Sequence, residues 1–508
     1  MKIIIILLAV SSFYLNVTFS QDGYRININK LNIPIDNSGI IAHVDIPLDG
    51  WGGRFEEALF VFSGGFFISG FNADTLWACG QATSSLVVNF FPGNVGSNQF
   101  DPRYKVYVVK KSDPEFGSSW QEWAFAVDIG AEFYDGNNDG IYTPVDLNGN
   151  GEWDINEDRP DIIGDLTTWC VFNDGQPSAR RLRFAGVHPQ GIEIQQTVFA
   201  YNLGKMYLQN AIFIRYKIFN AGNNNPVLDS VYFSVWADGD IGDNFNSDLV
   251  GTDTLVSSIY TYKNVPDADS GYGANPPAFF KSFLQGPHTY IPGVTFIDNN
   301  FNGTYEDSID TPLDSATNFM GSIRGIQWIP GATNLNLTST MNYHQSDPWH
   351  GDPSHQSEAR NYMLGLNKFG EIIDPCTWQY GEVFGGINCS EVNPYFIYSG
   401  DPTSNVGWIN TMHTNQKTIL NTGPFTLREN ESVYIIAAYI VGRGDNPLSS
   451  IPAASEIAAF VQQFYQSNFD DNLVDVNDDM ELVINDYVLY QNYPNPFNPF
   501  TKISYQIP

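Results

Sequence analysis

Short apolar runs separated by Gly, Pro, Asn and Asp recur along most of the chain, and several of them alternate apolar with polar residues. A period of two places successive side chains on opposite faces of a strand, so that one face can be buried. Strands of this kind joined by short turns form antiparallel sheets. The sequence therefore predicts a mainly β protein, made of antiparallel β-sandwich domains with inserted loops and few helices. The segments that carry the pattern are 58–69, 104–109, 191–201, 211–219 and 231–236.

Two elements near the C-terminal end depart from this alternation. Residues 431–441 form a nearly unbroken apolar run, which is typical of a strand covered on both faces. The single strong helical pattern follows, with Ser450 as a cap, Pro452 in the first turn and an apolar face that includes Phe464. We expect this helix to pack on the sheet. We also expect core positions for the large aromatic residues Trp120, Trp123 and Phe125.

Residues 135–165 are rich in Asp, Asn and Gly at a spacing that turn chemistry alone does not require. A twelve-residue calcium loop takes oxygen ligands from positions 1, 3, 5, 7, 9 and 12, and it needs Gly at position 6. Two overlapping matches occur here. The first loop has Asp135, Asn137, Asp139, the carbonyl of Ile141 and Asp146; the second loop has Asp146, Asn148, Asn150, the carbonyl of Glu152, Asp154 and Glu157.

Ca²⁺ is the cofactor that this donor set predicts. It is a hard cation that takes six to eight oxygen ligands, and the stretch contains neither His nor Cys, the usual ligands of transition metals. In this interpretation Asp146 serves both loops. The alternative is a surface loop whose Asp and Asn side chains only form local turns.

A third stretch matches the spacing incompletely. Asp298, Asn300, Asn302 and Glu306 occupy positions 1, 3, 5 and 9, with Gly at position 6, but position 12 is an isoleucine. The closing carboxylate would then be Asp307 or Asp310. Asp310 completes our set of candidate ligands for this third loop.

Two other groups of polar residues fit no metal template. An acidic cluster follows the strand at 231–236, and we expect a solvated loop there, with a cation site as the alternative; it comprises Asp238, Asp240, Asp243, Asp248 and Asp253. Three histidines lack the spacing of a helical pair and are separated by prolines, which predicts ordinary loop histidines rather than a zinc site; they are His344, His350 and His355.

The first twenty residues have the features of a secretory signal peptide. Lys2 precedes an apolar segment at 3–10, and small residues at 18 and 20 suit cleavage before Gln21. This apolar segment is too short to span a membrane, and no later segment is long enough. The sequence therefore predicts a secreted or cell-surface protein without a membrane span.

Four cysteines suit an oxidising compartment. Cys376 and Cys389 bracket a short loop and are predicted to form a disulfide, whereas pairing of Cys79 with Cys170 has no such support. Because no Cys-x-x-Cys pair is present, a zinc ribbon and dithiol redox chemistry are not expected. The formal net charge of −32 also argues against nucleic acid or an anionic membrane as partner.

The C-terminal residues carry a specific motif. The block Gln-Asn-Tyr-Pro-Asn-Pro-Phe-Asn-Pro at 491–499 leads into a strand-like segment at 501–507. It resembles the opening of the C-terminal sorting domain of type IX (Por) secretion substrates. The resemblance implies the type IX secretion machinery as a partner, export to the cell surface, and further strands beyond Pro508. The first and second loops resemble EF-hand-like and dockerin-like calcium loops, and the body is similar to uncharacterised secreted proteins of this class.

These signals predict a series of segments along the chain. They are a signal peptide (1–20), an N-terminal β-rich domain with the tandem loops (21–190), one or more β-sandwich-like domains ending in a helix (191–470), an acidic linker (471–486) and the start of the sorting domain (487–508).

The expected function is that of a secreted or cell-surface calcium-binding protein with a structural, adhesive or glycan-binding role. The alternative is a secreted calcium-dependent hydrolase of the glycosidase type, because its two catalytic carboxylates need no fixed spacing in sequence. No Gly-x-Ser-x-Gly or His-Glu-x-x-His motif is present, and no residue is assigned a catalytic role.

Overall fold

The computed structural model describes residues 22–44, 51–56, 58–205, 207–222, 226–242, 247–267 and 271–470, together with the backbone of Val488–Leu489 and Tyr505–Gln506. The described residues up to Phe469 form one compact unit, and those from Asp470 onward belong to a second. In the second unit β30 (Val488–Leu489) pairs antiparallel with β31 (Tyr505–Gln506). The predicted signal peptide, the predicted linker and the Pro/Asn block at 491–499 lie outside the described residues.

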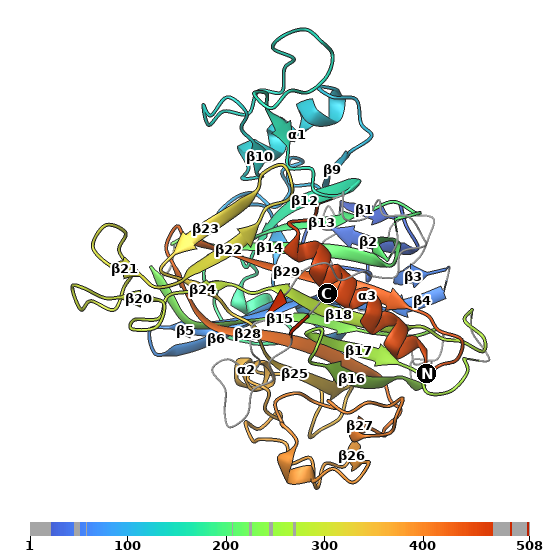
Figure 1. The fold of residues 1–508 in the computed structure, drawn as a ribbon. Helices are drawn as coiled ribbons and strands as arrows, with labels where there is room; N and C mark the ends of the chain where they lie inside the picture. Colours follow the sequence, from blue (N-terminus) through green and yellow to red (C-terminus); the bar gives the residue numbers. More distant parts are fainter. Residues whose placement is uncertain are drawn as a thin grey trace, which may run out of the picture. The chain divides into compact units, whose positions relative to one another are not determined.

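Two large antiparallel sheets form the body of the first unit (Figure 1). The larger sheet has the order β16 (Leu249–Asp253), β17 (Ser258–Tyr262), β18 (Ala278–Gln285), β29 (Ser432–Gly442), β14 (Ala211–Asn220), β13 (Ile192–Ala200), β12 (Leu166–Asn173) and β8 (Phe91–Pro92), and β9 (Tyr107–Lys110) also pairs with β12. The smaller sheet has the order β25 (Leu337–His344), β28 (Gln416–Arg428), β15 (Val227–Asp238), β5 (Ser63–Asn72), β6 (Thr75–Ala82) and β7 (Val87–Val88). The predicted mainly β, sandwich-type fold is confirmed.

Aromatic side chains fill the space between the two sheets. Phe66 of the smaller sheet lies 5.9 Å from Phe172 and 5.8 Å from Tyr216 of the larger one, measured between ring centroids. Lys281 of β18 is also buried here and donates to the backbone carbonyls of Val235 and Thr418 at 3.2 and 2.6 Å. Every second side chain of a strand points to the same face of its sheet, so the inward-facing residues of the two sheets pack against each other in this layer.

The strand and helix predicted near the C-terminal end are both present. β29 lies between β14 and β18 and is almost wholly buried, and α3 (Ser450–Gln466) packs on β29 and β18. Phe464 of α3 lies 5.1 Å from the ring of Tyr201. The cap residue is Ser449 rather than Ser450, which lies inside the helix and donates to the carbonyl of Pro276 at 2.7 Å.

The sequence missed two other helices, α1 (Ser118–Asp128) and α2 (Gln356–Met363). Trp120 and Trp123 of α1 are buried in a small core with β9 and β12, as expected for large aromatics, but Phe125 is 55% exposed, which corrects its predicted core position. Spacing of three places both tryptophans on one face of the helix, whereas Phe125 lies on the other.

The domain boundary expected near residue 190 falls inside the first unit. β12 and β13, which lie on its two sides, pair over eight residues from Leu166↔Ala200 to Asn173↔Glu193. Both parts of the chain thus contribute adjacent strands to one sheet. In the smaller sheet, too, strands far apart in sequence are neighbours, as β28 and β15 and then β15 and β5 are.

Smaller elements complete the fold. Strands β1 (Gly23–Ile26), β2 (Leu31–Asp36), β3 (Gly53–Phe55) and β4 (Ala58–Val61) form a four-stranded sheet. Two-stranded ribbons are β10 (Phe133–Tyr134) with β11 (Arg159–Pro160), β19 (His288–Thr289) with β24 (Thr333–Asn334), β20 (Phe296–Ile297) with β21 (Thr311–Pro312), β22 (Ser315–Phe319) with β23 (Ile326–Pro330), and β26 (Gly381–Phe384) with β27 (Gly407–Asn410). Short 3₁₀ turns are η1 (Thr83–Ser85), η2 (Ser178–Arg180), η3 (Leu208–Asn210) and η5 (Cys389–Glu391).

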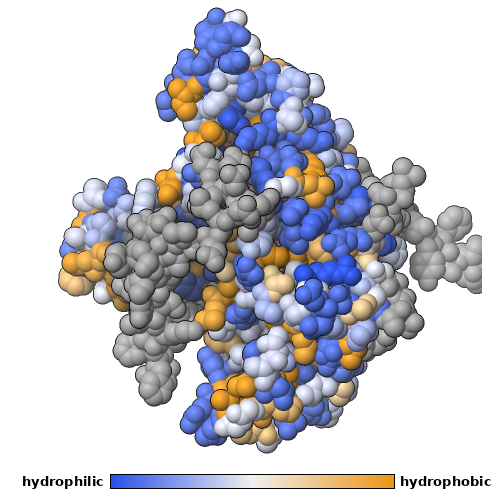
Figure 2. Space-filling view, turned by 45° about the vertical axis from the view of Figure 1, so that its right-hand side comes forward, coloured by the Kyte–Doolittle hydropathy of each residue, from blue (hydrophilic) through white to orange (hydrophobic). Residues whose placement is uncertain are grey.

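The surface is mixed in character. Apolar residues on the face drawn in Figure 2 form separate small patches within a largely hydrophilic surface. Among the described residues, no helix is both long and apolar enough to cross a membrane.

Candidate metal loops and the pocket beside the disulfide

The first and second loops project from a narrow base. β10 pairs with β11 through Phe133↔Pro160 and Tyr134↔Arg159, so the two ends of the segment 135–158 lie side by side. The segment extends beyond α1 at the top of Figure 1. Tyr142 and Trp153 pack against the small aromatic core under α1.

The second loop has the internal hydrogen bonds of a tightly wound calcium loop. Asp146 at position 1 accepts the N–H of Gly151 at position 6 through Oδ2, at 2.7 Å. Gly151 has φ +80°, which an L side chain adopts only with strain. Glu157 at position 12 accepts the N–H groups of Leu147 at 2.6 Å and Asp154 at 3.0 Å, which are positions 2 and 9. Hydrogen bonds from the backbone, first that of Gly151, lower the pKa of Asp146.

In the first loop the closing backbone hydrogen bonds are made by Asp158, whereas the sequence assigned the closing position to Asp146. Asp158 accepts the N–H groups of Gly136 at 3.0 Å and Thr143 at 2.7 Å, again positions 2 and 9. The carboxylate of Asp146 instead accepts N–H groups of its own loop, from residues 149, 150 and 151. The second loop is therefore nested within the first rather than following it, and a twelve-residue window cannot detect the pairing.

The third loop repeats the arrangement between β20 and β21. Asp298 Oδ2 accepts the N–H of Gly303 at 2.7 Å. Asp310 accepts the N–H groups of Asn299 at 2.9 Å and Glu306 at 2.8 Å, so it takes the closing position that the sequence left open between Asp307 and Asp310. In the third loop Asp310, one residue beyond position 12, thus accepts the same two backbone N–H groups, at positions 2 and 9, that the longer side chain of Glu157 accepts from position 12 of the second loop.

Side chains at positions 3, 5 and 9 converge in the second and third loops. In the second loop the amides of Asn148 and Asn150 donate to Asp154 Oδ2 at 2.6 and 3.0 Å. In the third, Asn300 and Asn302 donate to Glu306 Oε2. Within the described part of the chain, no three His, Cys, Asp or Glu side chains gather as a metal site. Each loop offers a mixture of carboxylate and amide oxygens, which suits Ca²⁺ and not a transition metal.

A buried charge network attaches the base of the two-loop segment to the larger sheet. Glu132 precedes β10 and accepts from Lys217 of β14 at 3.0 Å and from Arg324 at 2.7 Å. Asp161 follows β11 and pairs with Arg215 of β14 and with Arg324. Burial disfavours the charge on Glu132, but Arg324, Arg215 and Lys217 outweigh it and hold its pKa below the usual range.

The acidic cluster is buried, so the prediction of a solvated loop is wrong for Asp238, Asp240 and Asp248. Asp238 lies opposite Lys417 in the β15–β28 register and accepts the hydroxyl of Ser84 at 2.6 Å. Burial raises the pKa of all three carboxyl groups. Asp253 is half-buried and accepts the hydroxyl of Ser455 at 2.7 Å, and Asp243 lies outside the described residues.

Two of the three histidines are core residues, which corrects the expectation of loop histidines. His344 ends β25, His350 is buried, and their ring centroids lie 5.9 Å apart; His355 is exposed before α2. Burial lowers the pKa of His344 to about 4 and that of His350 to about 3, so both rings are neutral at pH 7. The Nδ1 of His344 shares a hydrogen bond with Thr414 at 2.6 Å.

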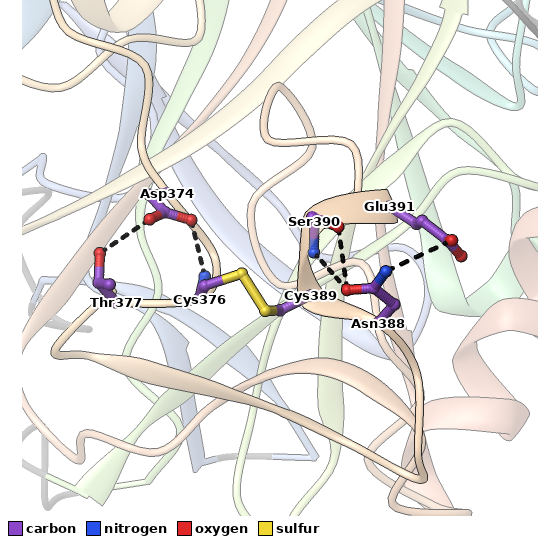
Figure 3. The surroundings of a disulfide bond; sticks show 7 residues. All are labelled: Asp374, Cys376, Thr377, Asn388, Cys389, Ser390 and Glu391. Carbon is purple, nitrogen blue, oxygen red and sulfur yellow. Dashed lines mark hydrogen bonds between the residues drawn. A yellow bond between two sulfur atoms is a disulfide. The ribbon is translucent and has the colours of Figure 1, made fainter.

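The predicted disulfide is present (Figure 3). Cys376 and Cys389 are joined, with Cα atoms 5.1 Å apart, while Cys79 and Cys170 are buried free thiols. The bridge closes a loop that contains Trp378, Tyr380 and the strand β26, which begins at Gly381. The ring of Tyr380 lies 4.3 Å from that of His344, tilted by 38°, and its hydroxyl donates to Asp347 at 2.5 Å.

An open pocket of about 670 Å³ adjoins this cluster. Its walls come from the turn after β25, from the segment that leads into β28, and from Tyr380. The lining includes one carboxylate, Asp347. Sequence analysis treated His344 only as a loop histidine and did not predict this site, because residues up to 71 positions apart line it and only the fold brings them together.

Similarity to known proteins adds no assignment to this geometry. No protein-family model matches the chain, and no match is found among curated proteins. The residues themselves therefore carry the functional argument.

Proposed function

We propose that this protein is a calcium-stabilised β-sandwich that acts outside the cytoplasm as a binding or scaffold module and is exported by type IX secretion. The observation that carries the calcium assignment is the shared design of three loops. In each, a carboxylate at position 1 accepts the N–H at position 6, and a closing carboxylate bridges the N–H groups at positions 2 and 9.

Charge supports a requirement for the cation. Nine Asp and Glu residues and one Arg occupy the stretch 135–165. The single cation, Arg159, lies 4.7 Å from the ring of Trp153 and is half-buried. Mutual repulsion among the carboxylates opposes the closed loops, and a bound divalent ion offsets it with six to eight oxygen contacts.

The residues that would hold Ca²⁺ follow from the geometry. For the first loop they are Asp135, Asn137, Asp139, the carbonyl of Ile141 and Asp158; for the second, Asp146, Asn148, Asn150, the carbonyl of Glu152, Asp154 and Glu157; for the third, Asp298, Asn300, Asn302, Glu306 and Asp310. Bound Ca²⁺ would supply structural cross-links between loop segments. The Cys376–Cys389 bridge and the resemblance of the C-terminal block support the extracellular location.

Thermal unfolding of the purified chain with Ca²⁺ and with excess chelator tests the proposal. We expect a higher midpoint with Ca²⁺, because binding to the folded state alone stabilises that state. The variant Glu157→Gln should lose part of this difference, whereas Asp445→Asn, which changes an exposed acid outside the loops, should keep it. Equal midpoints with and without Ca²⁺, together with no calcium by elemental analysis, would exclude the calcium assignment.

A further inference from the structure

The pocket beside the disulfide has polar groups suited to a ligand rather than to packing alone. Its lining includes His344, Gln345, Asp347, Tyr380, Thr414 and Asn415. Asn415 Oδ1 and His344 Nε2 are buried atoms without a hydrogen-bond partner among the described residues. Both atoms are shielded from water, and such unpaired buried atoms are rare in native structures. The volume is in the range of small-molecule sites.

Asp347 is held as a fixed acceptor. Its Oδ1 accepts the N–H groups of Trp349 at 2.7 Å and His350 at 2.8 Å, and its Oδ2 accepts the hydroxyl of Tyr380 at 2.5 Å. Burial opposes ionisation, but these hydrogen bonds, first that from Tyr380, lower the pKa of Asp347. Each carboxylate oxygen can accept more than one hydrogen bond, so the group remains able to bind a ligand hydroxyl.

One exposed aromatic residue, Trp349, lies on the turn that carries Asp347, and it contacts a second, Phe369, which follows α2. Trp349 follows the lining residue Pro348 and is 67% exposed, and its ring lies 5.8 Å from that of Phe369, which is 56% exposed. Two large aromatic side chains left in water, one of them adjacent in sequence to a residue that lines the pocket, indicate a contact surface. A flat indole ring covers the apolar C–H face of a sugar ring, while side-chain amides and hydroxyls bind its hydroxyl groups.

The charge of the site selects among ligands. Asp347 is the one ionised group in the lining, and His344 is neutral at pH 7 because burial lowers its pKa. With a chain charge of −32, an anionic polysaccharide would be repelled. The donor and acceptor side chains of Gln345, Thr414 and Asn415 match uncharged hydroxyl groups.

Contacts within the protein hold the aromatic side of the pocket in place. The rings of Tyr380 and His344 are in contact, with their centroids 4.3 Å apart, and Trp378 donates to the hydroxyl of Tyr398 at 2.9 Å. The disulfide restrains the segment that carries both Trp378 and Tyr380. Preorganisation of this kind lowers the entropic cost of binding.

We propose that this pocket binds a neutral saccharide, with Trp349 as the stacking platform and Asp347 as a hydrogen-bond acceptor for sugar hydroxyls. The proposal rests on the proposed binding role, and it adds the ligand class and the place of binding.

The test uses the full chain with Ca²⁺ on an array of neutral, anionic and amino-sugar glycans, followed by calorimetry with the neutral oligosaccharide that binds best. We expect Trp349→Ala to weaken that binding by about tenfold or more, since exposed aromatic anchors dominate such contacts. Asp347→Asn should weaken it as well. Trp328→Ala is the matched control, because Trp328 is 63% exposed on β23 and should not affect binding. Thermal unfolding confirms that each variant is folded.

Several results overturn the inference. If the chain binds only charged glycans, the neutral saccharide is excluded as the ligand. If Trp349→Ala and Asp347→Asn both bind the oligosaccharide as tightly as the native chain does, this pocket is excluded as the binding site. Release of shorter sugars that Asp347→Asn abolishes would make the site catalytic rather than a binding site. Absence of all glycan binding in a chain that Ca²⁺ still stabilises rejects the saccharide site and leaves the proposed function intact. Saccharide binding by a chain whose stability does not change with chelator supports the saccharide site and rejects the calcium assignment.

Discussion

The buried charge network at the base of the two-loop segment allows a quantitative prediction. We replace Arg215, whose side chain is 4% exposed, with Met, which keeps much of the apolar volume but removes the charge. Asp161, also 4% exposed, then retains only Arg324 at 3.1 Å, and Glu132 loses one of its three cations. Removing one partner of a buried ion pair costs about 3 kcal/mol, which lowers the folding constant more than a hundredfold.

Urea unfolding followed by tryptophan fluorescence measures this cost. The double variant Arg215→Met with Asp161→Asn should be destabilised by less than the sum of the single variants, with a coupling of about 1.5 kcal/mol, because each single change leaves the other charge buried. Arg103→Met is the control, since Arg103 pairs with Asp101 on the exposed surface and its loss should leave stability unchanged. Additive single effects, or an Arg215→Met variant as stable as the native chain, would refute the network as an anchor.

Three further outcomes are expected. Asp158→Asn should reduce the calcium content by one ion per chain in elemental analysis, and an unchanged content would reject the nested arrangement. Because the pKa of Glu132 is lowered from 4.5 in the folded state, its contribution to stability is present above pH 4.5 and is lost as pH falls below it. The difference in unfolding free energy between the native chain and Glu132→Gln should therefore shrink below that pH. A difference that does not change with pH argues against a lowered pKa of Glu132 in the folded state. The pair of changes Cys376→Ser and Cys389→Ser should lower stability by about 3 kcal/mol, as measured by urea unfolding, with no effect of reductant on the variant.

Local patterns in the sequence predicted those elements whose structure depends on local residues. Period two identified the strands that became β13, β14 and β15, and the apolar run at 431–441 identified the doubly covered β29. The Cys376–Cys389 pair was predictable for the same reason, since only thirteen positions separate the two residues. Helix α1 was missed because its tryptophans and phenylalanine favour strands as an intrinsic preference, and packing on a small core overrides it.

Features that depend on tertiary contacts were not predictable. Asp238, Asp240 and Asp248 look like a solvated loop in sequence, but the ends of β15 and β16 bring them into the interior, near Lys417 and Lys263. The pocket of His344 and Asn415 forms because β25 and β28 are neighbours in the smaller sheet. The closing role of Asp158 was not predictable, because the whole second loop separates Asp158 in sequence from the other residues of the first loop.

Nesting makes the two ion sites depend on each other through the entropy of loop closure. Gly136 and Asp158, which close the first loop, are 22 residues apart, whereas Leu147 and Glu157 of the second loop are 10 apart. Once the second loop is closed, the first has about 12 residues left to order instead of 22, which reduces its closure cost by about 0.5 kcal/mol. Occupation of the second loop should thus raise the affinity of the first about twofold, and linkage requires the reverse effect to be equal. The two ions would bind with weak positive cooperativity, although no ligand atom needs to be shared between the two sites.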